Sequence, residues 1–284
     1  MSAIAEQGEK MVAAVRDRYG RIAEGKLDGC CGASASPCSG TAVTDLSESL
    51  GYSPAELQGL AEANLGLGCG APVDHLKLQP GEHVLDLGSG AGIDVFLAAK
   101  RVGAEGRVIG VDMTPEMLQK ARANAARLGF PQVEFREGRL ERLPVDSASV
   151  DAVTSNCVIN LVPDKAVVFH EIGRVLKPGG RVAVSDLALL RPLPKEIVGM
   201  VEALVGCVAG AVLVDETERM ARDAGLADVL LRKKPEYVRA VQSFEDPLYR
   251  KIAEHLPPGT SAEDFITSLD VEATKPKAPK ACCG

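Results

Sequence analysis

The spacing of apolar residues changes along the chain and predicts where helices give way to strands. Through residues 1–28 apolar residues recur at helical spacing, as at Met11, Val15, Tyr19 and Ile22, which predicts one amphipathic helix. Residues 29–40, GCCGASASPCSG, are small or helix-breaking and predict a loop. In SPAEL, Ser53 is placed as an N-cap and Glu56 as its capping-box partner, so a second helix starts there and ends at LGLGCG, residues 65–70.

From residue 80 onward, short apolar runs alternate with helical patterns. Because strands separated by helices form parallel pairs through right-handed crossovers, this alternation predicts an α/β fold with a mostly parallel sheet and helices on both faces. Residues 265–275 place Phe265, Leu269, Val271 and Ala273 on one face, which predicts a final antiparallel edge strand. The predicted strands are 82–88, 107–113, 132–138, 150–156, 181–187 and 227–231, and the predicted helices are 91–102, 115–128, 164–176, 195–209 and 215–224.

These patterns divide the chain into four predicted parts. Residues 1–64 form a helical segment with a cysteine-rich loop, and residues 65–225 form the main α/β domain. Residues 226–275 form a small C-terminal region, and residues 276–284 form a disordered tail.

Charge and hydropathy narrow the range of partners. The net charge of −7 leaves no broad basic surface, so we expect no nucleic-acid partner. No apolar run reaches the length of a membrane span, and the N-terminus lacks the basic start and long apolar region of a signal peptide. We therefore expect a cytoplasmic monomer that acts on a small molecule.

A glycine loop joins the first predicted strand to the first predicted helix. VLDLGSGAG places Asp86, Gly88 and Gly90 at this junction, where an open α/β sheet binds ligands. The third glycine of the dinucleotide fingerprint is replaced by Ile93, which weakens a pyrophosphate-binding reading. The D-x-G-x-G-x-G spacing, Asp112 at the end of the next strand and LKPGG before the fifth strand resemble class I S-adenosylmethionine-dependent methyltransferases. The resemblance implies a Rossmann-like fold and S-adenosylmethionine as the methyl donor.

Three of the eight cysteines lie next to ordered segments. Cys157 follows the fourth strand, Cys207 lies near the end of the helix after the fifth strand, and Cys69 lies on a glycine turn. All three thiols can reach the carboxyl edge of the sheet, although each is also a common small core residue. A reducing cytosol keeps thiols free, and thiolates suit soft thiophilic ions. Three thiolates around a trivalent arsenic, for example, would leave its lone pair free to attack the methyl group.

The segments SNCVINLVPDK (155–165), GCG around Cys69 and GCVAGA around Cys207 resemble arsenite S-adenosylmethionine methyltransferases. The resemblance covers roughly residues 65–225 and implies that Cys69, Cys157 and Cys207 bind As(III) or its thiol conjugate. It also implies one N-terminal functional cysteine, which matches Cys30, Cys31 or Cys38, with Cys31 or Cys30 favoured. The implied cofactor contacts are Gly68, Asp86, Gly88, Gly90, Asp112, Met113, Leu140, Glu141 and Asn156.

The implied activity is methylation of arsenite, which detoxifies arsenic, with glutathione or thioredoxin restoring oxidised thiols. Two other functions stay open at this point. One is a methyltransferase for a small organic acceptor such as a quinone or sterol ring, with the cysteines as packing residues. The other is a non-enzymatic protein that sequesters arsenic or mercury, which the pairs Cys30–Cys31 and Cys282–Cys283 favour.

Overall fold

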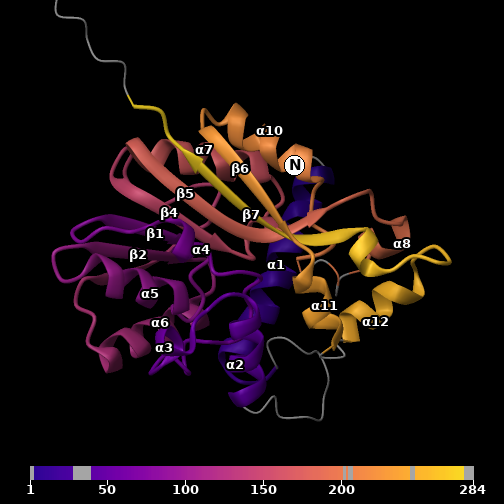
Figure 1. The fold of residues 1–284 in the computed structure, drawn as a ribbon, viewed down its shortest axis with the longest axis horizontal. Coiled ribbons are helices and arrows are strands. Elements are labelled where there is room, and N and C mark those ends of the chain that lie inside the picture. Colours follow the sequence, from indigo (N-terminus) through magenta and orange to yellow (C-terminus); the bar gives the residue numbers. More distant parts are fainter. Residues whose placement is uncertain (1–2, 28–39, 201–202, 204–206, 244–246, 278–284) are drawn as a thin grey trace, which may run out of the picture.

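A seven-stranded sheet forms the centre of the molecule (Figure 1). The computed structural model describes residues 3–27, 40–200, 203, 207–243 and 247–277. The strand order across the sheet is β3-β2-β1-β4-β5-β7-β6. The strands are β1 (His83–Leu87), β2 (Arg107–Asp112), β3 (Val133–Glu137), β4 (Val150–Asn156), β5 (Leu176–Leu189), β6 (Ala227–Lys234) and β7 (Ile266–Thr274).

The first five strands are parallel, as their alternation with helices predicts. β7 is antiparallel to both β5 and β6, so its predicted direction is correct. Its predicted position at the edge is wrong, because β7 lies between β5 and β6. Burial explains the difference: most of β7 is buried on both faces, whereas exposed positions alternate along β6 and include Leu230 and Lys233. β6 can therefore lie at the edge of the sheet, and β7 and β6 together complete the sheet beside β5.

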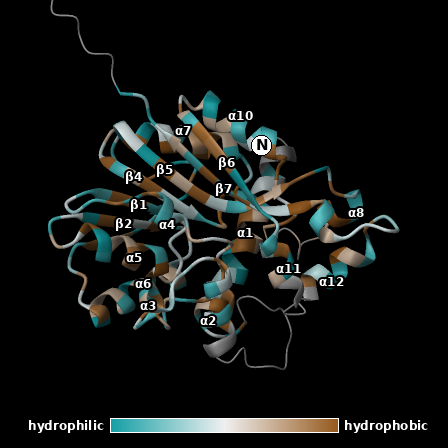
Figure 2. Ribbon diagram, viewed as in Figure 1, coloured by the Kyte–Doolittle hydropathy of each residue, from teal (hydrophilic) through white to brown (hydrophobic). Residues whose placement is uncertain are grey.

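Helices cover both faces of the sheet. Successive residues along a strand point to opposite faces, so the apolar residues of the strands contribute to two hydrophobic cores, one on each face. Val84 and Val108 face α4, α5 and α6, whereas Leu85 and Leu87 face α7 and α10. Figure 2 shows hydrophobic positions, in brown, on the strands and on the helices around them. The helices are α1 (Ala3–Ala23), α2 (Gly40–Ser49), α3 (Pro54–Leu57), α4 (Pro72–His75), α5 (Ile93–Val102), α6 (Pro115–Leu128), η1 (Ile159–Leu161), α7 (Lys165–Val175), α8 (Lys195–Val198), α10 (Val214–Asp223), α11 (Glu236–Ser243), α12 (Pro247–Glu254) and η2 (Ala262–Asp264).

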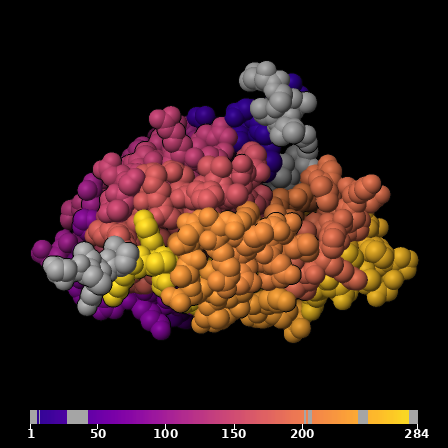
Figure 3. Space-filling view, turned by 90° about the horizontal axis from the view of Figure 1, so that it is seen from above, coloured from indigo at the N-terminus to yellow at the C-terminus, as the bar shows by residue number. Residues whose placement is uncertain are grey.

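The N-terminal helix α1 crosses the carboxyl edge of the sheet and packs on α6 and η1. In the space-filling view its indigo surface lies against the magenta central segment, on the side away from the orange strands and helices (Figure 3). Val15 and Tyr19 of α1 pack into a third apolar cluster, which also contains Cys69, Cys157 and Cys207. The helix predicted at residues 1–28 is therefore present, and it covers the thiol-bearing edge.

Two predicted helices differ from the structure. The capping box of Ser53 and Glu56 is present, but α3 ends after one turn at Leu57. Gly59 and Gly66 follow with positive φ angles of 79° and 65°, which end a right-handed helix. In the helix predicted at 195–209, α8 ends at Val198, Ala203 is helical, and Cys207 lies in a turn with a φ of 65°, while residues 201–202 and 204–206 lie outside the described part. A left-handed residue cannot continue an α-helix.

Among the described residues, no helix has both the length and the apolar character needed to cross a membrane.

Candidate functional site

The glycine loop after β1 bends sharply against the start of α5. Gly88, Gly90 and Gly92 have φ angles of 67°, 50° and 101°, a backbone region that side chains disfavour. Gly88 also has no room for a side chain, since an added Cβ would lie 2.5 Å from Cγ2 of Val158. The loop therefore needs glycine for both its conformation and its close approach to the chain after β4.

Asp112 ties the end of β2 to this loop. Its carboxylate accepts a hydrogen bond from the Gly90 N–H at 2.9 Å and one from the Thr114 N–H at 2.8 Å.

The nine residues implied as cofactor contacts come from five separate segments, yet all of them line one cavity at the carboxyl edge of the sheet. They are Gly68, Asp86, Gly88, Gly90, Asp112, Met113, Leu140, Glu141 and Asn156.

The cavity wall is acidic. Burial raises the pKa of Asp86 well above its usual value, and the neighbouring carboxyls of Asp94 and Asp112 raise it further. Burial likewise raises the pKa of Asp94 to about 6 and that of Asp112 above its usual range. Among the described residues that line the cavity, Arg139 is the one basic side chain, and it is paired with Glu141. This balance favours a cationic ligand over a phosphate-bearing one.

Three thiols converge beside the cavity. Cys157 directly follows β4, lines the cavity and donates its backbone N–H to the Ser185 carbonyl at 2.8 Å. The Cys69 thiol donates to the same carbonyl at 3.3 Å, and the Cys207 thiol donates to the Cys157 carbonyl at 3.0 Å. All three thiols are free and buried. The structure thus brings together the three cysteines that the sequence pattern selected, from three distant segments.

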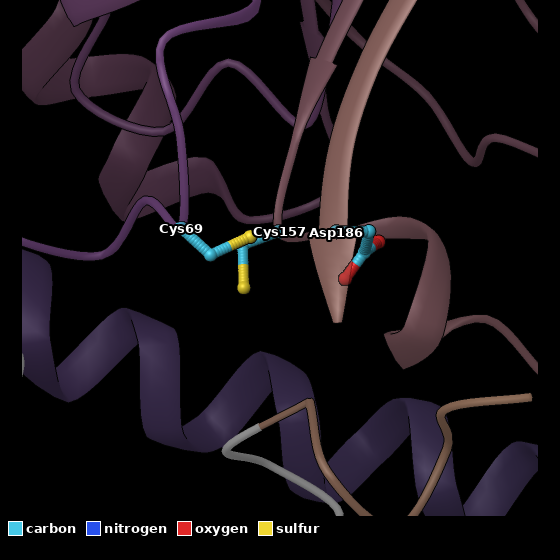
Figure 4. Close-up of side chains that lie close together, drawn as sticks. All are labelled: Cys69, Cys157 and Asp186. Atoms are coloured by element: carbon cyan, nitrogen blue, oxygen red, sulfur yellow. The ribbon is translucent and has the colours of Figure 1, made fainter. Parts of the chain in front are cut away.

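The carboxylate of Asp186 on β5 belongs to the same cluster (Figure 4). One ligand atom each from Cys69, Cys157 and Asp186 lie within 4.8 Å of one another. Figure 4 shows the two sulfurs and the carboxylate around a common space above α1, with Cys69 coming from a loop and Asp186 from the end of β5. This arrangement can hold a thiophilic ion between the end of the sheet and the N-terminal helix.

The environment of the three thiols favours their protonated form. Burial is the main cause that raises the pKa of Cys69. For Cys157, a hydrogen bond from Cys207 lowers the pKa, but the contact with Cys69 and burial outweigh it and the net shift is upward. The contact with Cys157 and burial raise the pKa of Cys207, and Tyr19 opposes them. Cys157 and Cys207 also have left-handed φ angles of 55° and 65°, which cost free energy and are typical of functional sites.

Asn156 anchors the turn that carries Cys69. Its Oδ1 accepts the Cys69 N–H at 2.9 Å, while its Nδ2 donates to the Gly70 carbonyl at 2.8 Å. The glycines on either side of Cys69 permit this approach: a Cβ at Gly68 would lie 2.8 Å from the Asn156 Nδ2, and one at Gly70 would lie 2.4 Å from the Ser185 Oγ. The Gly-Cys-Gly pattern is therefore a packing requirement of the thiol cluster.

Sequence reasoning missed three side chains that support the two sites. Tyr52 donates to Asp94 at 2.8 Å, and Asn156 Nδ2 donates to both Tyr52 and Asp94. Asp186 was also missed. It is an acidic residue near the carboxyl end of the parallel strand β5, and such strand ends are where α/β sheets bind ligands, so its position was a usable signal. Nothing local in the sequence pairs Tyr52 with a helix some 40 residues away. Cys30, Cys31, Cys38, Cys282 and Cys283 lie outside the described residues, as does the predicted tail from residue 278.

The sequence is similar to a known protein family and to proteins of known activity. Residues 78–225 match the family model described as a methyltransferase domain. An arsenite methyltransferase from Halobacterium salinarum is 44% identical over 270 residues, which cover 92% of this chain and 66% of that protein. The human arsenite methyltransferase is 38% identical over 168 residues, which cover 56% of this chain and 44% of that protein. The chain thus spans about two thirds or less of these relatives.

Among solved structures, an arsenic(III) S-adenosylmethionine methyltransferase from Chlamydomonas reinhardtii superposes with a TM-score of 0.61 and 32% identity. The match covers 81% of this chain and 75% of the algal chain. A phosphoethanolamine N-methyltransferase from Haemonchus contortus, solved with S-adenosylmethionine, shares the fold at 19% identity and a TM-score of 0.60. The sheet, the cavity and these relatives together show that the chain belongs to the class I methyltransferases and, within them, to the arsenite methyltransferase family.

Proposed function

We propose that this protein transfers a methyl group from S-adenosylmethionine to trivalent arsenic held by Cys69, Cys157 and Cys207. The observation that carries the proposal is the meeting of three buried thiols, from three distant segments, at the rim of one acidic cavity. Three thiolates satisfy the valence of As(III) and leave its lone pair free to react. The acceptor atom and the donor cavity are then adjacent, which brings the two reactants together in a site that excludes water.

The raised pKa values of the thiols are compatible with arsenic binding. When arsenous acid binds, each thiol forms an As–S bond and its proton leaves with one hydroxide of arsenic as water. The exchange needs no free thiolate beforehand, because the leaving hydroxide accepts the proton. Burial of all three thiols then keeps water away from the bound arsenic.

The cavity residues fit a cationic methyl donor. Among the described residues, the buried Ser89 Oγ on the cavity wall has no hydrogen-bond partner, so a polar group of a ligand can satisfy it. Asp112, at the end of β2, is placed to accept ribose hydroxyls, and the acidic wall suits positive charge. When bound, S-adenosylmethionine supplies an electrophilic methyl group on a positively charged sulfur. Asn156 contributes by fixing Cys69 relative to this cavity.

The proposal extends to the wider reaction. Cys31 or Cys30 serves as the additional N-terminal thiol, and glutathione or thioredoxin regenerates thiols that are oxidised during turnover. The methylated arsenicals formed in this way make the physiological role arsenic detoxification.

The test is arsenic speciation after incubation of the protein with arsenite, S-adenosylmethionine and a thiol. We expect methylated arsenic from the wild type and none from Cys157→Ser or Cys207→Ser, while both variants still bind S-adenosylmethionine in calorimetry. Val208→Ala is the matched control, because Val208 is fully buried next to Cys207 but has no thiol. It should keep methylating arsenite.

Two outcomes would overturn the proposal. Turnover that persists in both cysteine variants would show that these thiols do not hold the acceptor. Tight arsenite binding by the wild type without any methylated product would instead identify an arsenic-sequestering protein.

A further inference from the structure

Asp186 is a buried carboxylate beside the thiols that thiolate binding of arsenic does not use. It directly follows Ser185, whose carbonyl accepts both the Cys69 thiol and the Cys157 N–H. One of its oxygens lies within 4.8 Å of the Cys69 and Cys157 sulfurs. An arsenic atom bonded to both sulfurs would therefore lie beside this carboxylate (Figure 4).

The carboxylate is held rigidly before any ligand binds. Its Oδ1 accepts the Asn160 Nδ2 at 2.9 Å and the Leu187 N–H at 2.8 Å, and its Oδ2 accepts the Asn160 N–H at 3.2 Å. Burial raises its pKa to about 6, and these hydrogen bonds and Lys165 act in the opposite direction. Three N–H donors hold the carboxylate as an acceptor, which favours its charged form, and it faces the thiol cluster with a fixed negative charge (Figure 4).

The charges of the proposed reaction show what such a group can do. Arsenic bound by three thiolates is neutral, whereas the sulfonium of the methyl donor is positive. The arsenic lone pair forms the new As–C bond, the S–C bond of the sulfonium breaks, and its electron pair stays on sulfur. The donor thus becomes a neutral thioether, and the positive charge appears on arsenic. A fixed negative charge beside arsenic stabilises the transition state more than the ground state.

We propose that the Asp186 carboxylate is a catalytic residue of methyl transfer, which stabilises the positive charge that develops on arsenic. This inference rests on the proposed function of the thiol cluster. It assigns Asp186 an effect on the methyl-transfer step, separate from the binding of arsenite by the cysteines or of the donor by the cavity.

The test compares Asp186→Asn with Asn160→Ala at pH 8. Asn160→Ala removes an Asp186 hydrogen bond and a second one to the Leu187 carbonyl, but it keeps the charge. The measurements are the single-turnover rate of methyl transfer to prebound arsenite and, separately, the dissociation constants of arsenite and S-adenosylmethionine. We expect Asp186→Asn to slow methyl transfer roughly 100-fold, the scale of removing one preorganised electrostatic group, with both dissociation constants within about threefold of wild type. Asn160→Ala should slow transfer much less.

Three outcomes would overturn the inference. The first is a wild-type transfer rate in Asp186→Asn. The second is equal slowing by the two variants, since a structural role predicts it. The third is a matching loss of arsenite affinity, which would make Asp186 part of the binding site alone. If Asp186→Asn does not fold, Asp186→Ser replaces it, because its smaller side chain leaves room for water to accept from Asn160 and Leu187. A wild type that does not methylate arsenite would reject the proposed function itself, so the two failures are distinguishable.

Discussion

Replacing Asn156 with alanine separates its two possible roles, as the anchor of Cys69 or as a contact of the methyl donor. The wild-type side chain accepts the Cys69 N–H and shares its two amide hydrogens among the oxygens of Gly70, Tyr52 and Asp94. The substitution leaves the Cys69 N–H, the Gly70 carbonyl and an Asp94 oxygen without this partner. Each buried polar group left unpaired costs about 1–3 kcal/mol, and Asp94 keeps its hydrogen bond from Tyr52, which limits the total cost.

We therefore expect Asn156→Ala to lower the free energy of unfolding by roughly 2–4 kcal/mol, measured by urea denaturation. Freeing the Cys69 turn should also weaken arsenite binding about 10- to 100-fold in calorimetry, because the third thiol is no longer held in position. Affinity for S-adenosylmethionine should change less.

The matched control for this experiment is Thr154→Val on the same strand. Among the described residues the buried Thr154 Oγ1 has no hydrogen-bond partner, so its removal should be neutral or slightly stabilising. Wild-type arsenite affinity in Asn156→Ala, together with weakened donor binding, would refute the anchoring role and leave Asn156 as a donor contact.

Three further substitutions test the fold and the cavity. Gly88→Ala should abolish measurable donor binding and cost about 1–3 kcal/mol of stability, because φ is 67° and the new Cβ meets Val158; normal binding would contradict the loop geometry. Phe96→Ala should cost about 3–5 kcal/mol in urea denaturation, since Phe96 is fully buried, and a loss below 1 kcal/mol would contradict its place in the core. Burial raises the pKa of Asp94 from 3.8 to about 6, so the folded state binds the Asp94 proton more tightly than the unfolded state does. The contribution of Asp94 to the free energy of unfolding therefore falls as pH rises from about 4 to 6. Asp94→Asn should therefore gain stability relative to wild type across that window, by at most about 3 kcal/mol, and a difference independent of pH would refute the shift.

The parallel part of the fold follows from local patterns in the sequence. β1, β2 and β4 are short, mostly apolar runs near turn residues, β3 alternates apolar and charged residues, and the intervening helices have helical spacing, so period and length together identify them. The position of β7 could not be read in this way. Its insertion between β5 and β6 depends on burial of both its faces in the finished sheet, and the segment 265–275 shows only that one face is apolar.

The residues of the candidate site were predictable to different degrees for physical reasons. Asp86, Gly88 and Asp112 stand at strand ends, and the topology of a parallel sheet brings strand ends to one edge. Cys69 and Cys207 lie on irregular segments, so the sequence showed only that both thiols can reach this edge, and the family resemblance selected them as ligands. Their actual positions depend on single long-range contacts, such as the Ser185 carbonyl for Cys69 and the Cys157 carbonyl for Cys207.

The polar interruption at the end of β4 gains a structural explanation from these contacts. A core strand that ended in apolar residues could pack well, but it could not hold a neighbouring turn by hydrogen bonds. Asn156 provides an acceptor for the Cys69 N–H and donors for Gly70 and Asp94, so one side chain connects the thiol cluster to the wall of the acidic cavity. The next residue, Cys157, takes a left-handed conformation and accepts the Cys207 thiol through its own carbonyl. Because both neighbouring thiol segments depend on these two residues, substitutions at either one should disturb the cluster more than substitutions elsewhere on β4.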